Sequence, residues 1–151
     1  MKPNLLKTIA GGAVGTALMT AMIYFLAPRM LGHPMDIAAL LGGMLGNNWA
    51  LGMSAHLIAG IMIFPLAYAL IAYRFLPGPP VARGVLWGLV LWVIAESIVM
   101  PVLGAGFFHA GAGGIKAAMA GLIAHLLYGG SLGAIAGGPE AQLAERRARH
   151  V

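Results

Sequence analysis

The residues best suited to chemistry are two histidines, His56 and His125, because each sits at the centre of the same nine-residue pattern. The pattern reads G-x-x-x-H-L-x-x-G, with alanine before the histidine, and occurs at 52–60 and 121–129. Residues four apart lie on one face of a helix, so each histidine shares its face with two glycines. These flanking glycines are Gly52, Gly60, Gly121 and Gly129.

A pair of imidazoles on facing helices predicts a b-type haem site. Two imidazoles related by a two-fold axis can ligate one iron from opposite sides, and the flanking glycines would leave room for the macrocycle. Such a haem would carry electrons without catalysing bond chemistry. In this interpretation His56 and His125 are the axial ligands, and Trp92 and Met100 line the pocket.

Two other interpretations of the same histidines stay open. Small residues four apart bring helices together without any ligand, and each histidine would then hydrogen-bond a facing carbonyl, a hydroxyl or Glu96. Alternatively, thioethers and imidazoles suit Cu(I), and Met19 and Met22 could approach His56. Seven of the ten methionines fall in the expected outer half or outer loops: Met19, Met22, Met30, Met35, Met44, Met53 and Met100.

Glu96 is the one acidic residue inside an apolar segment. A charge there costs about 3 kcal/mol on insertion scales, so such a residue is a functional hypothesis by default. It would either accept a proton in a relay or quinone pocket, or pair with a histidine or with a helix of another subunit, and we favour pairing. His33 and His109 fall in outer loops, one in each half. We expect both to be solvent-exposed, with a shared outer binding surface as the alternative.

Composition places these residues in a membrane protein. Of 151 residues, 60% are hydrophobic and 9% are charged, and the mean hydropathy is +0.89. A soluble domain carries roughly 25% charged residues. Four apolar segments, each near the roughly 20 residues that cross a bilayer, predict an all-α protein. They lie at about 8–27, 49–73, 83–103 and 115–137. The absence of cysteine excludes disulfides, thiolate metal sites and iron–sulfur clusters.

The distribution of lysine and arginine predicts the orientation. Seven of the nine lie before the first segment, between the second and third, or in the tail at 138–151, whereas Arg29 and Lys116 lie in the other two loops. By the positive-inside rule both termini are cytoplasmic, in a bacterial inner (plasma) membrane. The tail arginines would meet anionic headgroups. Because the net charge of +5 is spread over these flanks, it does not indicate nucleic acid.

The two halves of the chain match each other. Gly11, Gly15, Leu18 and Pro28 recur at the same spacing as Gly84, Gly88, Leu91 and Pro101. Because each half has two spans, both enter the membrane in the same direction, with a pseudo-two-fold axis along its normal. We therefore predict a single membrane domain, a four-helix bundle of two parallel helical hairpins at about 8–73 and 83–137. His56 would face His125 in the outer half, at the depth of Glu96, and Asp36 would cap a short interfacial helix.

The chain resembles an uncharacterised bacterial family of small four-span integral membrane proteins over nearly its whole length. Besides the two histidine motifs, the resemblance rests on P-x-x-x-G at Pro28, M-D-I at Met35, L-P-G-P-P at Leu76 and M-P-x-x-G-x-G-F-F at Met100. It implies the four-span fold and brings no activity.

The sequence contains no Walker loop, dinucleotide fingerprint, zinc-protease motif or serine elbow, which favours a non-catalytic protein without settling the question. We expect an accessory subunit of a respiratory or photosynthetic membrane complex, most concretely a bis-His haem b protein. The alternatives are a structural or assembly subunit without a cofactor, and a Cu(I)-binding protein. The expected partners are the lipid bilayer and other membrane subunits or further copies of the chain.

Overall fold

The chain forms four long helices, seen in a computed structural model that describes residues 3–137. This part of the chain contains no strand, and the four helices are long and apolar enough to cross a membrane. They span Leu5–Leu31, Trp49–Leu70, Pro80–Val102 and Gly114–Ala136. The predicted all-α, four-span fold is therefore confirmed. The tail at 138–151 lies outside the described residues.

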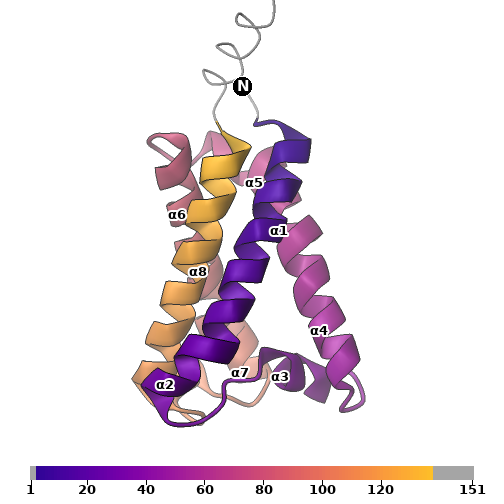
Figure 1. Cartoon of the computed structure of the whole chain (residues 1–151). Coiled ribbons are helices and arrows are strands. Elements are labelled where there is room, and N and C mark those ends of the chain that lie inside the picture. Colours follow the sequence, from indigo (N-terminus) through magenta and orange to yellow (C-terminus); the bar gives the residue numbers. More distant parts are fainter. Residues whose placement is uncertain (1–2, 138–151) are drawn as a thin grey trace, which may run out of the picture.

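The beginning of the first span and the end of the fourth lie at the same end of the bundle, which we call the termini end (Figure 1). We call the opposite end the far end. The first span comprises α1 (Leu5–Ala21), η1 (Met22–Leu26) and α2 (Ala27–Leu31). The second comprises α4 (Trp49–Ile58), η2 (Ala59–Ile63) and α5 (Phe64–Leu70). The third comprises α6 (Pro80–Ile94), η4 (Ala95–Val99) and α7 (Met100–Val102), and the fourth is the single helix α8 (Gly114–Ala136). Three short elements connect them: α3 (Ile37–Gly43), η3 (Ala72–Arg74) and η5 (Phe107–His109).

The segments η1, η2 and η4 are single π turns, and each ends two residues before a proline: Pro28, Pro65 or Pro101. Proline lacks an N–H, and its ring clashes with the carbonyl four residues earlier. A wider π turn before the proline relieves this clash without ending the helix. The fourth span has no proline and no π turn. η4 follows η1 at the same distance along the chain as Gly84 follows Gly11. The π turns of the first and third spans therefore occupy matching positions in the two halves of the sequence.

α8 lies at the centre of the bundle, with α1 and α6 packed along it. Glycines allow both contacts. A Cβ on Gly15 of α1 would lie 2.7 Å from the Tyr128 carbonyl oxygen, and a Cβ on Gly84 of α6 would lie 2.1 Å from that of Gly129. Such close backbone approach is typical of small-residue faces in membranes. The glycines that match between the two halves therefore both serve contacts with α8.

α4 packs differently from the other spans. It lies against α3, and in Figure 1 it diverges from α1 toward the far end, where α3 crosses beneath it. Only η2 and α5, nearer the termini end, pack along α1. The longer linker of the first half contains α3, and α4 packs against α3 where the other spans pack against a membrane-spanning helix. The two hairpins therefore differ in packing although their sequences match.

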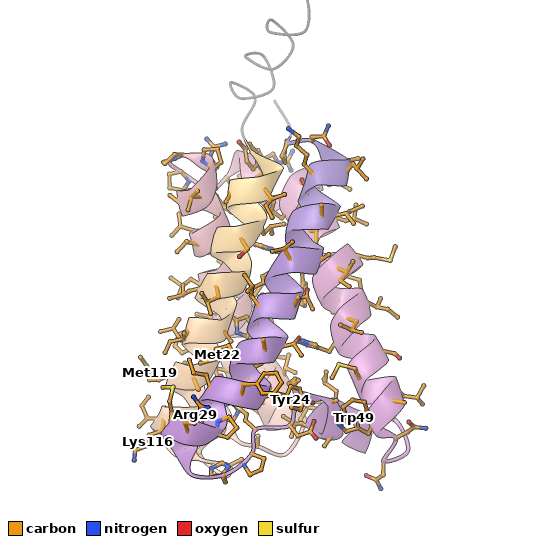
Figure 2. All side chains as sticks on the ribbon, viewed as in Figure 1. Met22, Tyr24, Arg29, Trp49, Lys116 and Met119 are labelled. Carbon is orange, nitrogen blue, oxygen red and sulfur yellow. The ribbon has the colours of Figure 1, made fainter. Side chains whose placement is uncertain are left out.

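α3 begins at Asp36, as predicted. The Asp36 carboxylate accepts hydrogen bonds from the Ala39 N–H at 2.9 Å, from the Trp49 indole N–H and from the Tyr24 hydroxyl. Tyr24 and Trp49 both lie beside α3 in Figure 2. Partial burial alone would raise the pKa of Asp36, but these hydrogen bonds outweigh it and hold the pKa below its ordinary 3.8. The carboxylate therefore ties the far ends of the first two spans to α3.

Candidate functional site

Glu96 and His109 form a buried carboxylate–imidazole pair at the far end. Glu96 lies on η4 and His109 on η5, and 2.8 Å separates Glu96 Oε2 from His109 Nδ1. Their residues are 2% and 4% exposed. The favoured prediction that Glu96 pairs with a histidine is confirmed. The expectation that His109 is solvent-exposed is wrong, because the loop turns its side chain inward.

The backbone of this loop explains why His109 points inward. Phe108 and His109 have φ angles of 48° and 56°, in the left-handed region that non-glycine residues rarely occupy. Such residues cost on the order of 1–3 kcal/mol each and cluster at functional sites. Packing holds them in place: the Phe108 ring lies edge-on to Trp92 at 5.4 Å, and the Trp92 indole N–H donates to the Ala118 carbonyl at 2.9 Å. The glycine-rich sequence at 104–114 indicates only an outer loop.

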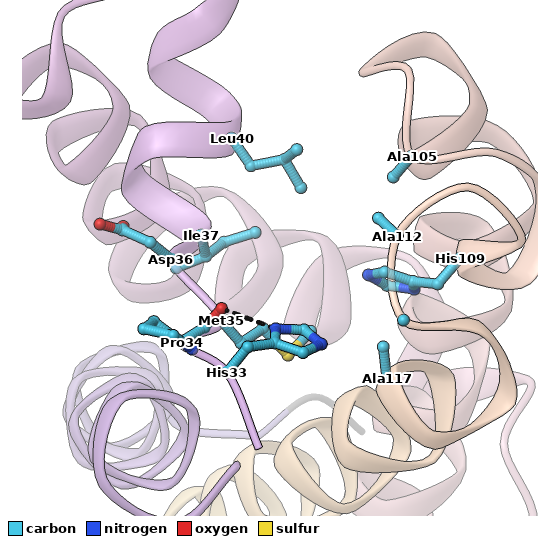
Figure 3. Close-up of a pocket in the computed structure, with 11 residues that line it drawn as sticks. His33, Pro34, Met35, Asp36, Ile37, Leu40, Ala105, His109, Ala112 and Ala117 are labelled. Atoms are coloured by element: carbon cyan, nitrogen blue, oxygen red, sulfur yellow. Dashed lines mark hydrogen bonds between the residues drawn. The ribbon is translucent and has the colours of Figure 1, made fainter. Parts of the chain in front are cut away.

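A cavity of about 410 Å³ lies next to the pair, between the loop before α3 and the loop between the third and fourth spans. This volume falls within the roughly 300–1,000 Å³ typical of small-molecule sites. His33 and His109 lie on opposite walls (Figure 3), and apart from Asp36 the remaining lining is apolar. The lining residues are His33, Pro34, Met35, Asp36, Ile37, Leu40, Ala105, His109, Ala112, Gly113 and Ala117. His33 is exposed, as expected. Both loop histidines line this one cavity, so a shared outer binding surface, the alternative, would lie here.

His56 and His125 are each held by one ring nitrogen. His56 Nε2 lies 3.0 Å from the Thr20 hydroxyl oxygen, and this hydroxyl donates to the Thr16 carbonyl at 2.7 Å. Because a hydroxyl has one proton, His56 Nε2 must be the donor. His125 Nδ1 donates to the Gly121 carbonyl at 2.8 Å. A hydroxyl and a carbonyl are the partners that the packing interpretation expects.

The two histidines are therefore opposite tautomers, with Nδ1 free on His56 and Nε2 free on His125. Their positions along the helices also differ. His125 is the central residue of α8, whereas His56 lies one turn nearer the far end of its span. His125 therefore lies deeper along its helix than the sequence predicted, because α8 begins about a turn earlier relative to the motif than α4 does.

The glycines flanking His56 face other parts of the protein. A Cβ on Gly52 would lie 1.9 Å from the Ala38 carbonyl oxygen of α3, and a Cβ on Gly60 would lie 2.3 Å from the Thr16 hydroxyl oxygen. The Gly60 carbonyl also accepts a hydrogen bond from the buried Tyr128 hydroxyl at 2.9 Å. Both glycines thus serve contacts between helices.

The glycines flanking His125 are similarly enclosed. A Cβ on Gly129 would lie 2.1 Å from the Gly84 carbonyl oxygen, and one on Gly121 would lie 3.1 Å from Glu96 Oε1. This contact places the Glu96 carboxylate one turn of α8 from His125. Within residues 3–137, no group of three or more His, Cys, Asp or Glu side chains has the arrangement of a metal site. The two methionines considered for copper, Met19 and Met22, are buried in the apolar core.

Four apolar helices around a buried acid–imidazole pair define a small all-α membrane protein with a candidate site at one end. The chain belongs to DUF6789, a family of unknown function, whose sequence model matches residues 3–145. This confirms the resemblance to an uncharacterised family. No curated protein and no solved structure matches the chain significantly.

Proposed function

We propose that the protein is a non-catalytic accessory subunit of an electron-transport membrane complex, and that its far-end cavity binds a quinone-class ring. The observation that carries this proposal is the buried Glu96–His109 pair, whose imidazole borders the cavity. An ionisable pair in such a place is costly to bury and favours a functional role. The π turn η4, which carries Glu96, and the left-handed backbone at His109 are further features typical of functional sites.

The cavity suits a flat apolar ring with polar oxygens at opposite edges. Its walls are formed mainly by alanine, isoleucine, leucine, proline and methionine side chains, with an imidazole on each of two opposite sides. A quinone ring is apolar and carries two carbonyl oxygens that accept hydrogen bonds. Nδ1 of His33 already donates to the Pro34 carbonyl and Nδ1 of His109 faces Glu96, so each imidazole donates to the ligand through Nε2 when that nitrogen is protonated. The site also lies at the end of the spans, near the headgroup region from which a lipid-soluble molecule would enter.

The pair adds the capacity to exchange a proton with such a ligand. An ionised carboxylate only accepts hydrogen bonds, so His109 Nδ1 carries the proton whenever Glu96 is charged. Sharing one proton between the two groups avoids a lone buried charge, which would cost several kcal/mol. A ligand oxygen beside the imidazole can therefore gain or lose a proton without leaving Glu96 unpaired. Any electrons would come from the other subunits of the complex.

Quinone binding can be measured by quenching of tryptophan fluorescence in lipid nanodiscs. Trp49 bonds Asp36 at the cavity and Trp92 packs on the loop that carries His109, so both report on this end. A short-chain quinone such as decylubiquinone should quench saturably. His33→Asn keeps an amide near the position of Nδ1, which faces the Pro34 carbonyl, but leaves nothing at the position of Nε2, from which the imidazole would reach a ligand. We expect this exposed change to weaken binding about tenfold, the effect of losing a hydrogen bond worth about 1.4 kcal/mol.

The control for this experiment is His56→Gln, which changes a histidine outside the cavity and should leave binding unchanged. Loss of binding in His109→Gln, with the fold intact by circular dichroism, would support the role of the pair. If the wild type shows no saturable quenching, or if His33→Asn and His109→Gln bind as tightly as the wild type, the proposal is wrong.

A bis-His haem b remains a second candidate, favoured by the free Nδ1 of His56 and the free Nε2 of His125. A histidine whose Nδ1–H donates to a carbonyl is oriented for a metal at Nε2. His56 would have to exchange its bond to Thr20 and turn its ring. The enclosed glycines leave little space for a macrocycle unless α4 moves, which weighs against this candidate. Copper held by these histidines with Met19 or Met22 is a third.

Two measurements on one purified sample distinguish haem from copper. A reduced-minus-oxidised spectrum with a low-spin b-type signal that is lost in both His56→Ala and His125→Ala would support haem, and metal analysis would detect copper. A colourless, metal-free and stably folded protein would refute both. It would leave the two histidines as packing residues of a structural or assembly subunit.

We further propose the bacterial inner membrane as the location, with both termini in the cytoplasm. Lys7 near the start of α1, Arg74 in η3 and Arg83 near the start of α6 lie at the termini end. Arg29 and Lys116 lie at the far end, as Figure 2 shows. Together with the tail, this asymmetry follows the positive-inside rule. The cavity would then face the periplasmic side. A reporter fused after Val151 that reads as periplasmic would overturn this orientation.

A further inference from the structure

A second polar cluster lies at the termini end, where α5 and η3 meet α6. Tyr68 and Tyr73 contact each other edge-to-face with ring centroids 5.5 Å apart, and Trp87 lies 6.4 Å from Tyr68. The Arg83 guanidinium sits over the Tyr73 ring, 4.5 Å from its centroid. Arg83 and Trp87 are four residues apart, so they share one face of α6.

Three buried polar atoms in this cluster have no hydrogen-bond partner: the Tyr68 hydroxyl, Arg83 Nε and the Trp87 indole nitrogen. Tyr68 is fully buried, with 0% of its surface exposed. Each of the three groups is a donor, and Arg83 is permanently charged. Buried polar groups without a partner are rare in native structures, so three in one cluster require an explanation.

The surrounding protein supplies no acceptor for these donors. The acidic residues among positions 3–137 are Asp36, at the start of α3, and Glu96, on η4, and both lie toward the far end. Arg83 as a whole is half-buried, and a water molecule at its Nε would offer two acceptor sites but no charge to balance the guanidinium. An oxyanion supplies both the charge and several acceptor oxygens.

We propose that Tyr68, Arg83 and Trp87 form a binding site for a phosphate group. Arg83 is the fourth residue of α6 and Tyr68 is the third from the end of α5, so the site lies within about 5 Å of the helix ends. That depth matches the headgroup layer, and basic pockets between membrane helices bind anionic headgroups. The phosphate can belong to a phospholipid or be free in solution. This inference is independent of the far-end site.

The experiment uses the delipidated protein in phosphate-free dodecyl maltoside and measures its unfolding midpoint by scanning fluorimetry. Three additions are compared: phosphatidylglycerol, a phosphate-free galactolipid of the same chain length, and inorganic phosphate. Stabilisation by phosphatidylglycerol beyond the galactolipid, with no effect of inorganic phosphate, identifies a lipid headgroup. Equal stabilisation by inorganic phosphate identifies a free anion. If neither phosphate source exceeds the galactolipid, the site holds water and the proposal is overturned.

Variants locate the effect. Arg83→Gln should weaken binding of the phosphate-bearing ligand about tenfold or more, as expected for the loss of a charge-assisted hydrogen bond. Arg74→Gln is the matched control, because Arg74 lies at the same end over the Phe75 ring and is exposed. If Arg83→Gln does not fold, Trp87→Phe removes one N–H from the site with a minimal change of shape. Binding that is unchanged in Trp87→Phe, or reduced equally by Arg74→Gln, contradicts the proposal.

Discussion

Replacing Tyr128 by phenylalanine should show how much the stability of the π turn η2 depends on the Tyr128 hydroxyl. In an α-helix the Gly60 carbonyl would accept a hydrogen bond from the Phe64 N–H, but this N–H donates to the Ala59 carbonyl instead. The residue one further along is Pro65, which has no N–H. The Tyr128 hydroxyl supplies the missing donor at 2.9 Å in a buried site. Tyr128→Phe removes this donor and leaves the carbonyl unpaired.

The expected cost follows from what an unpaired carbonyl loses. A buried group left without its partner typically costs about 1–3 kcal/mol. Side-chain hydrogen bonds in membrane proteins average about 0.6 and reach about 1.7 kcal/mol, because the unfolded state in lipid finds partners too. The Gly60 carbonyl is buried among α1 and α8 and has no donor within its own helix, so the upper part of this range applies. We predict a loss of about 1–2 kcal/mol in the free energy of unfolding.

The assay is unfolding by sodium dodecyl sulfate in phosphate-free mixed micelles, followed by circular dichroism. Tyr68→Phe is the matched control, because it deletes an equally buried hydroxyl that has no partner in the protein, and it should cost much less. A double mutant with Pro65→Ala restores an N–H five residues after Gly60 and should reduce the effect of Tyr128→Phe. Equal costs for the two tyrosine variants, or no coupling to Pro65, would refute this explanation of the π turn.

Two further predictions concern the packing of α8 and the cap of α3. Gly129→Ala should destabilise the fold by about 2 kcal/mol or more, because the added Cβ would lie 2.1 Å from the Gly84 carbonyl oxygen. Gly43→Ala is the control: a Cβ there would meet open space, so this variant should be nearly neutral in the same unfolding assay. The pKa of Asp36 lies below its ordinary 3.8, so the stability it contributes is fully present above that value and is lost as the pH falls through the lowered pKa. The emission of Trp49, which bonds this carboxylate, should report the transition; a matching transition in Asp36→Asn would show that another group causes it.

The number and extent of the spans could be predicted because they follow from hydropathy and length alone. The cap at Asp36 and the pairing of Glu96 with a histidine were also accessible, since both rest on local rules about which groups can be buried or left unpaired. The prolines at 28, 65 and 101 carried a signal for π turns. A proline inside an apolar span predicts a widened helix turn just before it.

The far-end cavity could not be predicted in the same way. It depends on two loops far apart in the sequence, and on Phe108 and His109 adopting a left-handed backbone that their residue types disfavour. The energetic cost of this backbone conformation is offset by packing of Phe108 against Trp92, and no local sequence pattern reveals that contact. The divergence of α4 from α1 likewise depends on the packing of α4 against α3. Long-range packing, rather than propensity, therefore decides which histidines share a site.

The central claim is that the Glu96–His109 pair exchanges a proton with the ligand in the far-end cavity. Infrared difference spectroscopy of the protein in nanodiscs, with decylubiquinone before and after its chemical reduction to the quinol, tests it most directly, because carboxylate and carboxylic acid absorb at different frequencies. We predict a change in the carboxyl bands on reduction of the bound quinone that is absent from Glu96→Gln and retained in His56→Gln. Saturable quinone binding with no change in any carboxyl band, or with the same change in Glu96→Gln, would contradict the claim.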